Sequence, residues 1–132
     1  MSLFKREDAL KTVVEENDRL RDAKNTYDNI KNPEIVKMML TLSQRKQLSF
    51  TKLTDELSIK PKQIHNYIDR LSISGEIKID FKRESPLQMF IGLSNFGENV
   101  LKDIFKLDNN NIETWRNYNI KHLSREIDSI LL

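Results

Sequence analysis

A run of polar side chains between residues 60 and 70 has the chemistry to bind nucleic acid. Gln63 and Asn66 carry amides that can form paired hydrogen bonds with adenine, while Lys62 can bond guanine or a phosphate group. The run is interrupted every three or four residues by an apolar side chain, which is the spacing of one buried helix face. The candidate nucleic-acid-binding residues of this stretch are Lys60, Lys62, Gln63, His65, Asn66 and Arg70.

A second basic group follows in a polar, proline-containing turn at residues 82–88. Lys82 and Arg83 lie at the start of this turn, between two short apolar runs. At the tip of a hairpin they would reach the minor groove or the flanking phosphate backbone of a duplex. Taken alone, however, polar residues on the outer face of an amphipathic helix favour an ordinary solvated surface, so the surrounding elements must decide between the two interpretations.

Three helices are predicted between residues 32 and 75. Asn32-Pro33-Glu34 is typical of a helix start, and the apolar positions that follow predict a helix that stops near residues 44–47. Ser49 is a plausible cap for a second helix, and the turn at residues 58–61 leads to a third helix that begins at Pro61 and ends at Gly75. The inward positions of these helices are Ile35, Met38, Met39, Leu42, Phe50, Leu53, Leu57, Ile64, Ile68 and Leu71.

A change of period after Gly75 predicts a β-hairpin. Residues 76–81 alternate, with Ile77, Ile79 and Phe81 on one face, and residues 89–93 form the second strand. Ser94 is then a plausible cap for another helix, whose apolar stripe consists of Phe96, Val100, Leu101, Ile104 and Phe105.

Both ends of the chain are predicted to be helical. Residues 3–28 carry an imperfect heptad pattern, which favours either a helix packed on its own domain or a dimeric coiled coil about equally. A single last helix is expected from about Ile112. We therefore expect an N-terminal helix in residues 1–31, a central domain in residues 32–107 and a dimerisation helix in residues 108–132. The candidate dimerisation residues are Leu10, Val13, Leu20, Ile120, Leu123, Ile127 and Ile130.

The order helix, helix, helix, hairpin, helix comes with a recognisable sequence pattern. Residues 48–77 (LSFTKLTDELSIKPKQIHNYIDRLSISGEI) resemble the winged helix-turn-helix domain of prokaryotic transcription regulators of the MarR and ArsR groups. Residues 93–101 (LSNFGENVL) are similar to the segment that closes the wing in MarR-like and PadR-like proteins. The resemblance covers residues 33–106 and implies a mainly α fold with a small β-hairpin wing, to which the terminal helices are added. Lys60 replaces the Ser or Thr that usually caps the third helix of such domains.

Composition argues against several other functions. The 132 residues include no cysteine and only two histidines, which disfavours thiolate metal sites and the metal sensing found in ArsR-type proteins. No catalytic motif or phosphate-binding loop occurs, so we expect neither an enzyme nor a cofactor. Without a long apolar run or a signal sequence, no membrane association and a cytoplasmic location are expected. Residues 33–107 carry twelve Lys/Arg against nine Asp/Glu, a mild excess that permits an anionic partner.

Two functions follow from these patterns as hypotheses. In the first, a homodimer recognises specific double-stranded DNA and regulates transcription, with the helix at residues 61–74 in the major groove and the wing at residues 82–88 on the minor groove or backbone. A non-specific DNA-coating protein is a variant of it. In the second, the domain is a protein–protein adaptor within a larger assembly. The sequence does not indicate an operator, a small-molecule effector, or whether the regulator activates or represses.

Overall fold

The computed structural model describes residues 23–43, 45–83 and 88–132. A helix at residues 23–30 is followed by α2 (Pro33–Ser43), the short strand β1 (Leu48–Ser49), α3 (Phe50–Leu57) and α4 (Pro61–Ser74). Strands β2 (Ile77–Lys82) and β3 (Gln88–Leu93) come next, and the chain ends with α5 (Asn95–Phe105), α6 (Ile112–Asn117) and α7 (Ile120–Leu131). The candidate dimerisation residues Leu10, Val13 and Leu20 lie outside the described residues.

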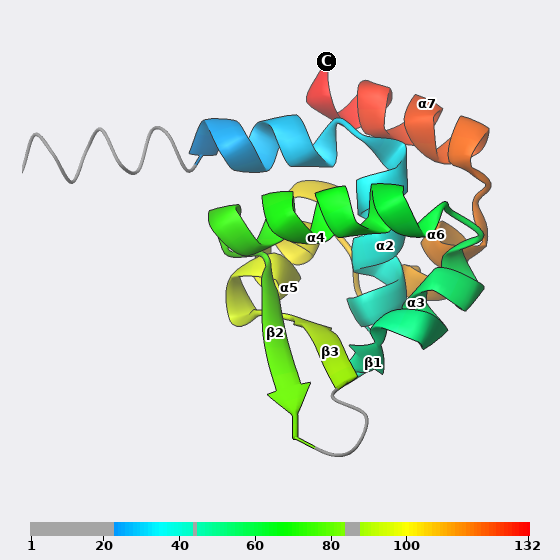
Figure 1. Ribbon diagram of the computed structural model, residues 1–132. Helices are drawn as coiled ribbons and strands as arrows, with labels where there is room; N and C mark the ends of the chain where they lie inside the picture. Colours follow the sequence, from blue (N-terminus) through cyan, green and yellow to red (C-terminus); the bar gives the residue numbers. More distant parts are fainter. Residues whose placement is uncertain (1–22, 44, 84–87) are drawn as a thin grey trace, which may run out of the picture.

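Helix α2 is the centre of the core. Asn32 accepts hydrogen bonds from the backbone N–H groups of Glu34 and Ile35 and so caps the helix start, as the sequence predicted. The spacing of apolar residues predicts one buried face, but Val36 and Leu40 are fully buried as well. The reason is that α2 is surrounded: α3, α5, α6, α7 and the sheet all pack against it (Figure 1).

The three strands form one antiparallel sheet in the order β1-β3-β2. The predicted hairpin is confirmed, with Ile77 paired to Leu93 at its base and Lys82 paired to Gln88 at its end. Strand β1, which pairs with β3, was not predicted. Gly92 permits this pairing, because a Cβ atom there would lie 2.6 Å from the backbone oxygen of Lys46.

Phe81 is the first correction to the sequence analysis. It was expected on the buried face of the hairpin, yet 58% of its surface is exposed. The hairpin extends beyond the helices that cover its base (Figure 1). Ile77 is therefore buried, Ile79 is partly buried, and Phe81 at the far end projects past the core.

The C-terminal region is the second correction, because the single expected helix is broken into α6 and α7. The ammonium group of Lys37 donates to the backbone oxygens of Arg116 and Tyr118, which stabilises the end of α6. The side chain of Asn119 then accepts from the N–H of His122, 2.8 Å away, and caps the start of α7. The break allows α7 to fold back against α2.

This fold-back changes the role of two candidate dimerisation residues. Leu123 and Ile127 are fully buried in the core of the same chain, so they do not offer a surface to a second copy. Ile120 and Ile130 lie on the same face of α7 but near its two ends, where each is 39% exposed.

Candidate nucleic-acid interface

The turn between α3 and α4 has the local chemistry that the sequence predicted. Ser49 caps α3 by accepting from the N–H of Lys52, and Ser58 ends that helix with a left-handed backbone, φ 53°. Pro61 occupies the first turn of α4, and Gly75 ends it with φ 90°. Lys60 stands at the cap position without a side-chain capping bond, as its residue type implied, and its ammonium group stays at the surface.

The outer face of α4 is not covered by any other described part of the chain. Ile64, Tyr67, Ile68 and Leu71 face the core, which turns the polar positions outward. Lys62, Asn66 and Asp69 follow each other at steps of four and three residues and form one exposed ridge along the helix. Ile73 continues this ridge in the last turn and is 79% exposed.

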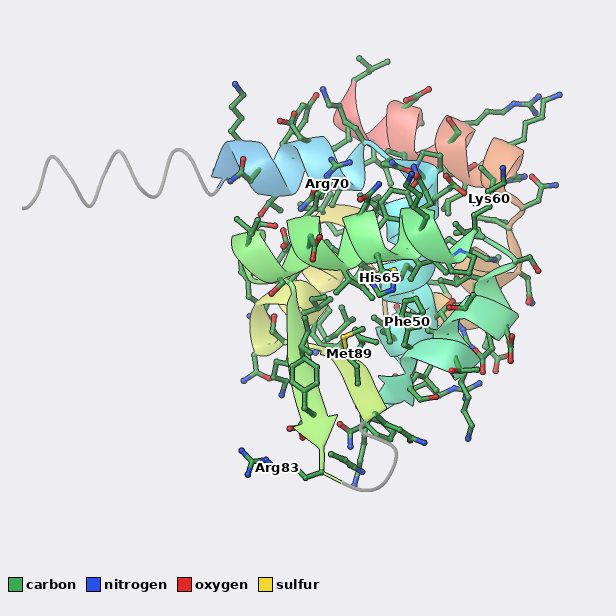
Figure 2. All side chains as sticks on the ribbon, viewed as in Figure 1. Phe50, Lys60, His65, Arg70, Arg83 and Met89 are labelled. Carbon is green, nitrogen blue, oxygen red and sulfur yellow. The ribbon has the colours of Figure 1, made fainter. Side chains whose placement is uncertain are left out.

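His65 and Gln63 lie beside the ridge, and each has a partner within the fold. The ring of His65 stacks on Phe50 of α3, with 4.2 Å between ring centroids and 25° between ring planes. Figure 2 shows this pair between α4 and α3, with Met89 of β3 close by. The side-chain nitrogen of Gln63 donates to the hydroxyl of Tyr67 at 3.1 Å. Both polar side chains therefore occupy defined positions and remain exposed.

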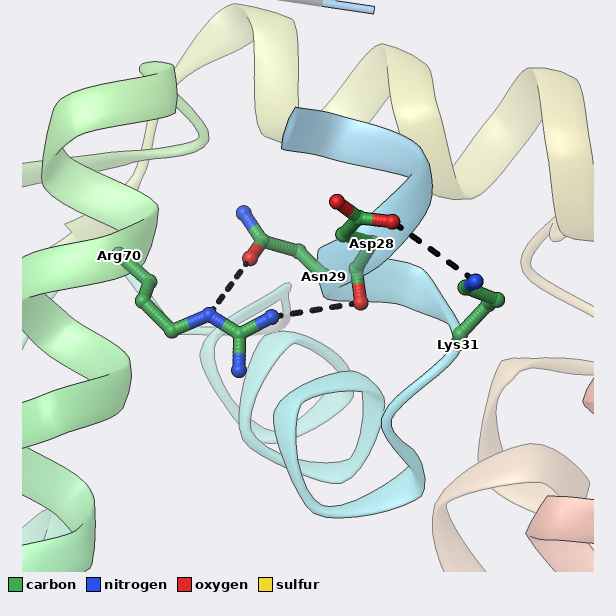
Figure 3. Close-up of polar contacts among 4 residues, drawn as sticks. All are labelled: Asp28, Asn29, Lys31 and Arg70. Carbon is green, nitrogen blue, oxygen red and sulfur yellow. Dashed lines mark hydrogen bonds and ion pairs between the residues drawn. The ribbon is translucent and has the colours of Figure 1, made fainter. Parts of the chain in front are cut away.

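Arg70 has a role that the sequence did not predict. Its Nε donates to Oδ1 of Asn29 at 3.1 Å, and its Nη2 donates to the backbone oxygen of Asp28 at 3.3 Å (Figure 3). Asp28 lies in the last turn of the helix at residues 23–30, where backbone oxygens have no partner within the helix. The guanidinium group of Arg70 thus caps that helix and holds it against α4.

A buried polar cluster continues this contact toward the hairpin. Asn29 donates to Ser74 at 2.8 Å, and the fully buried carboxylate of Glu76 accepts hydrogen bonds from Ser74 and from Thr26. Burying a carboxylate is costly unless hydrogen bonds compensate it, and here two hydroxyl groups supply them. The helix at residues 23–30 is therefore joined to the end of α4 by buried hydrogen bonds as well as by packing.

The far end of the hairpin carries the second predicted group. Lys82 and Arg83 are both exposed, and the ammonium group of Lys82 lies 4.5 Å from the centre of the Phe90 ring. Figure 2 shows Arg83 at the hairpin end and Lys60 at the start of α4, so one basic group lies at an end of the α4 ridge and another at the end of the hairpin. Lys78 of β2, which is not among the residues predicted from the sequence, is exposed as well.

Solved structures of other proteins share this arrangement of helices and strands. No protein-family model matches the chain, and no curated protein matches it in sequence. Solved structures do match: HlyU from Vibrio cholerae has a TM-score of 0.52 at 15% identity, over 67% of this chain and 97% of that one. A MarR mutant from E. coli in complex with operator DNA has a TM-score of 0.51 at 12% identity, over 99% and 96% of the two chains. The heme sensor PefR from Streptococcus agalactiae, in complex with heme, has a TM-score of 0.50 at 13% identity, over 98% and 89%.

The fold is a winged helix-turn-helix. Within this fold, α3 and α4 form the helix-turn-helix and the β2–β3 hairpin is the wing. The fold class that the sequence predicted, mainly α with a small β-hairpin wing and added terminal helices, is thereby confirmed. At these identities the likeness concerns the fold, so function has to be argued from the surface of this winged helix.

Three negative observations complete the description of the winged helix. Within residues 23–43, 45–83 and 88–132, no group of three or more His, Asp or Glu side chains is arranged to hold a metal ion. In the same ranges no helix is both long and apolar enough to cross a membrane. Every buried side-chain nitrogen or oxygen in this part of the protein has a hydrogen-bond partner.

Proposed function

We propose that the chain is a sequence-specific double-stranded DNA-binding transcription regulator that acts as a homodimer. The recognition helix α4 lies in the major groove, and the wing contacts the minor groove or the phosphate backbone. The observation that carries this proposal is the uncovered ridge of α4, on which Lys62 and Asn66 stand exposed beside Gln63. These side chains have the hydrogen-bonding groups that base edges require.

In this proposal, one set of residues determines sequence preference and a second set supplies affinity. Lys62, Gln63, Asn66 and His65 face the base edges or nearby phosphates and determine sequence preference. Lys60, Lys82 and Arg83 contact phosphates on either side and supply affinity that does not depend on sequence. Arg70 caps the helix at residues 23–30, so we place it outside the base-reading set and assign it to the positioning of α4.

The homodimer is supported by apolar surface near the ends of the chain. Ile120 and Ile130 on α7 are exposed, and Leu132 at the C-terminus is fully exposed. A groove of about 800 Å³ lies between the helix at residues 23–30, α5 and the end of α7, and Tyr27 and Phe96 line it. We propose that a second copy covers this region. The central domain at residues 32–107 would then bind DNA while the segments on either side form the dimer.

DNA binding at two salt concentrations tests the proposal. The wing variant Lys82→Ala/Arg83→Ala should weaken binding to all sequences and reduce the slope of log K against log salt by about 2, because two phosphate contacts are lost. The ridge variant Lys62→Ala/Asn66→Ala should instead reduce the preference for the selected site. A matched control is Lys102→Ala/Lys121→Ala, which removes the same charge from exposed positions on α5 and α7.

A protein–protein adaptor remains the second candidate, and specific side chains favour it. Ile73 on the ridge and Phe81 on the wing are large, apolar and mostly exposed, which is typical of a surface that binds another protein. Absence of DNA binding at low salt would favour this candidate. Binding at low salt with no selected sequence in a random library would instead indicate a DNA-coating protein.

A further inference from the structure

A chain of two hydrogen bonds connects the interior of the fold to one of the proposed base readers. The hydroxyl of Tyr67 donates to Oε1 of Glu34 at 2.7 Å, and it accepts from Nε2 of Gln63 at 3.1 Å. Tyr67 is only 2% exposed, whereas Gln63 stands at the surface of α4. Glu34 lies in the first turn of α2, where the helix dipole favours a negative charge.

The direction of both hydrogen bonds is fixed by the carboxylate. A carboxylate only accepts, so the single hydrogen of the Tyr67 hydroxyl must point to Glu34. The hydroxyl oxygen can then only accept from Gln63, which has to present its NH₂ group and not its oxygen. An inverted amide would place two oxygens against each other with no hydrogen between them. Glu34 therefore determines, through Tyr67, which way the amide of Gln63 is turned.

This arrangement leaves Gln63 with a restricted set of free groups. One of its two N–H hydrogens is used by Tyr67, so one N–H donor and the Oε1 acceptor remain for a ligand. In the major groove adenine offers one donor, N6–H, and one acceptor, N7. Guanine offers two acceptors, O6 and N7. The free groups of Gln63 complement adenine. A paired contact with guanine would need both N–H hydrogens of Gln63, and one of them is already bonded to the Tyr67 hydroxyl.

We propose that Tyr67, held by Glu34, is a positioning residue that makes Gln63 select adenine over guanine at one base pair of the DNA site. This inference rests on the proposed function and adds to it the base that one side chain reads and the cause of that choice. Neither Tyr67 nor Glu34 contacts the base. Both act through the orientation of the Gln63 amide.

Selection of bound sequences from a random DNA library tests the proposal with four proteins. Wild type should show one position at which adenine is preferred over guanine, and Gln63→Ala should abolish the preference at that position only. Tyr67→Phe frees the second hydrogen of Gln63, so the adenine-to-guanine ratio should fall by about tenfold, the lower range for a paired base contact. Glu34→Gln should lower it too, because an amide at position 34 can donate to Tyr67 and let the hydroxyl turn its hydrogen toward Gln63.

Two controls separate this effect from a general loss of structure. Tyr118→Phe removes a tyrosine hydroxyl from a partly exposed position between α6 and α7, outside the Gln63–Tyr67–Glu34 chain, and it should leave the ratio at the wild-type value. Preferences at positions that do not depend on Gln63 should also persist in Tyr67→Phe. If Gln63→Ala removes an adenine preference that Tyr67→Phe leaves intact, the proposal is wrong.

A measurement on the free protein keeps this test distinct from the test of DNA binding. In NMR spectra of the wild type, the side-chain N–H hydrogen of Gln63 that is bonded to Tyr67 should exchange with water more slowly than the corresponding hydrogen of a solvated glutamine, and its chemical shift should differ from that reference. Tyr67→Phe should bring both to the values of a solvated amide. If wild type selects no sequence, the proposed function and this reading role both fail, while the spectra still report on the hydrogen bond. If both hydrogens of wild-type Gln63 already have the shifts and exchange rates of a solvated glutamine, the hydrogen bond and the inference fail, whatever the DNA result.

Discussion

Nε of Arg70 donates a 3.1 Å hydrogen bond to Oδ1 of Asn29, and this bond joins α4 to the helix that precedes α2. The two residues stand 41 positions apart in the sequence. The contact places a basic side chain of α4 in a structural role, and it makes the position of α4 depend on residues 23–30. Figure 3 shows the same guanidinium group at the backbone oxygen of Asp28.

Loss of this contact should release the helix at residues 23–30. Arg70→Ala is expected to lower the free energy of unfolding by about 1 kcal/mol and to speed amide hydrogen exchange in residues 23–30. Arg70→Lys should recover little of the lost stability. A single ammonium group cannot donate to both acceptors as the two guanidinium nitrogens do. Lys62→Ala on the same helix is the control. Equal exchange in wild type and Arg70→Ala would contradict the capping role.

The break between α6 and α7 should depend on Lys37. Lys37→Met removes the ammonium group that donates to the ends of α6 and keeps much of the apolar stem, so we expect a loss of about 1–2 kcal/mol in denaturant unfolding. Lys121→Met at an exposed position of α7 should change stability little. A Lys37→Met variant as stable as wild type would show that packing alone keeps α6 and α7 apart.

Stability should fall at alkaline pH through Tyr67. Burial and the hydrogen bond to Glu34 raise the pKa of the Tyr67 hydroxyl above its usual value of 10.0. A raised folded-state pKa contributes stability that is complete below the unfolded pKa and is lost as the pH rises through the folded pKa. Unfolding free energies measured from pH 8 upward should therefore decline more steeply for wild type than for Tyr67→Phe.

In the same alkaline range, Lys37 contributes to the pH dependence of stability with the opposite sign to Tyr67. Its burial, and next the charge of Arg116, lower its pKa from 10.5, so the unfolded chain binds more protons between the two pKa values and stability rises with pH there. The comparison of wild type with Tyr67→Phe removes this contribution, because both proteins contain Lys37. If the two proteins have parallel pH profiles, the pKa of Tyr67 is not raised in the folded protein.

The dimer should depend on the exposed ends of the apolar face of α7 and not on its buried middle. Ile130→Asp adds a charge to an exposed apolar position, so we expect a folded monomer by light scattering with little change in unfolding free energy. Ile127→Asp would bury a charge in the core and should unfold the protein instead. A dimeric Ile130→Asp protein would place the interface elsewhere.

Two glycines should be intolerant of even a methyl group. A Cβ atom on Gly97 would lie 2.2 Å from the backbone oxygen of Glu76, and one on Gly92 would lie 2.6 Å from that of Lys46. Either Ala variant should cost more than about 2 kcal/mol, because backbone atoms must move. Gly75→Ala has room for its Cβ but requires φ 90°, so its cost should be nearer 1 kcal/mol. Thermal unfolding of the three variants checks this order.

Local sequence chemistry predicted most of the helix boundaries. Asn32, Ser49 and Ser94 cap helices, and Gly75 ends one, because each acts through hydrogen bonds or backbone angles within a few residues. The spacing of apolar residues alone distinguished the hairpin from the helices. These features need no knowledge of distant parts of the chain.

The missed features depend on contacts between distant residues. The break after α6 involves Lys37, which lies 79 residues before Arg116, and no glycine or proline marks it. Phe81 follows the alternation of its strand, but its exposure depends on how far the hairpin extends beyond the helices. The partners of Arg70 and Tyr67 come from segments 41 and 33 residues away, so the sequence indicated which side chains are polar and not what they bind. Strand β1 has two residues, too few to show a period.

The buried carboxylate of Glu76 has an evolutionary consequence. Thr26 is one of the two hydroxyl partners of this carboxylate. A fragment that begins at residue 32 would therefore lack one of its hydrogen-bond donors and expose the carboxylate to water. Recombination that transferred only the helix-turn-helix and wing to another protein would therefore be selected against. Among related sequences, we expect the residues at positions 26, 29, 70, 74 and 76 to covary and to be inherited as one set.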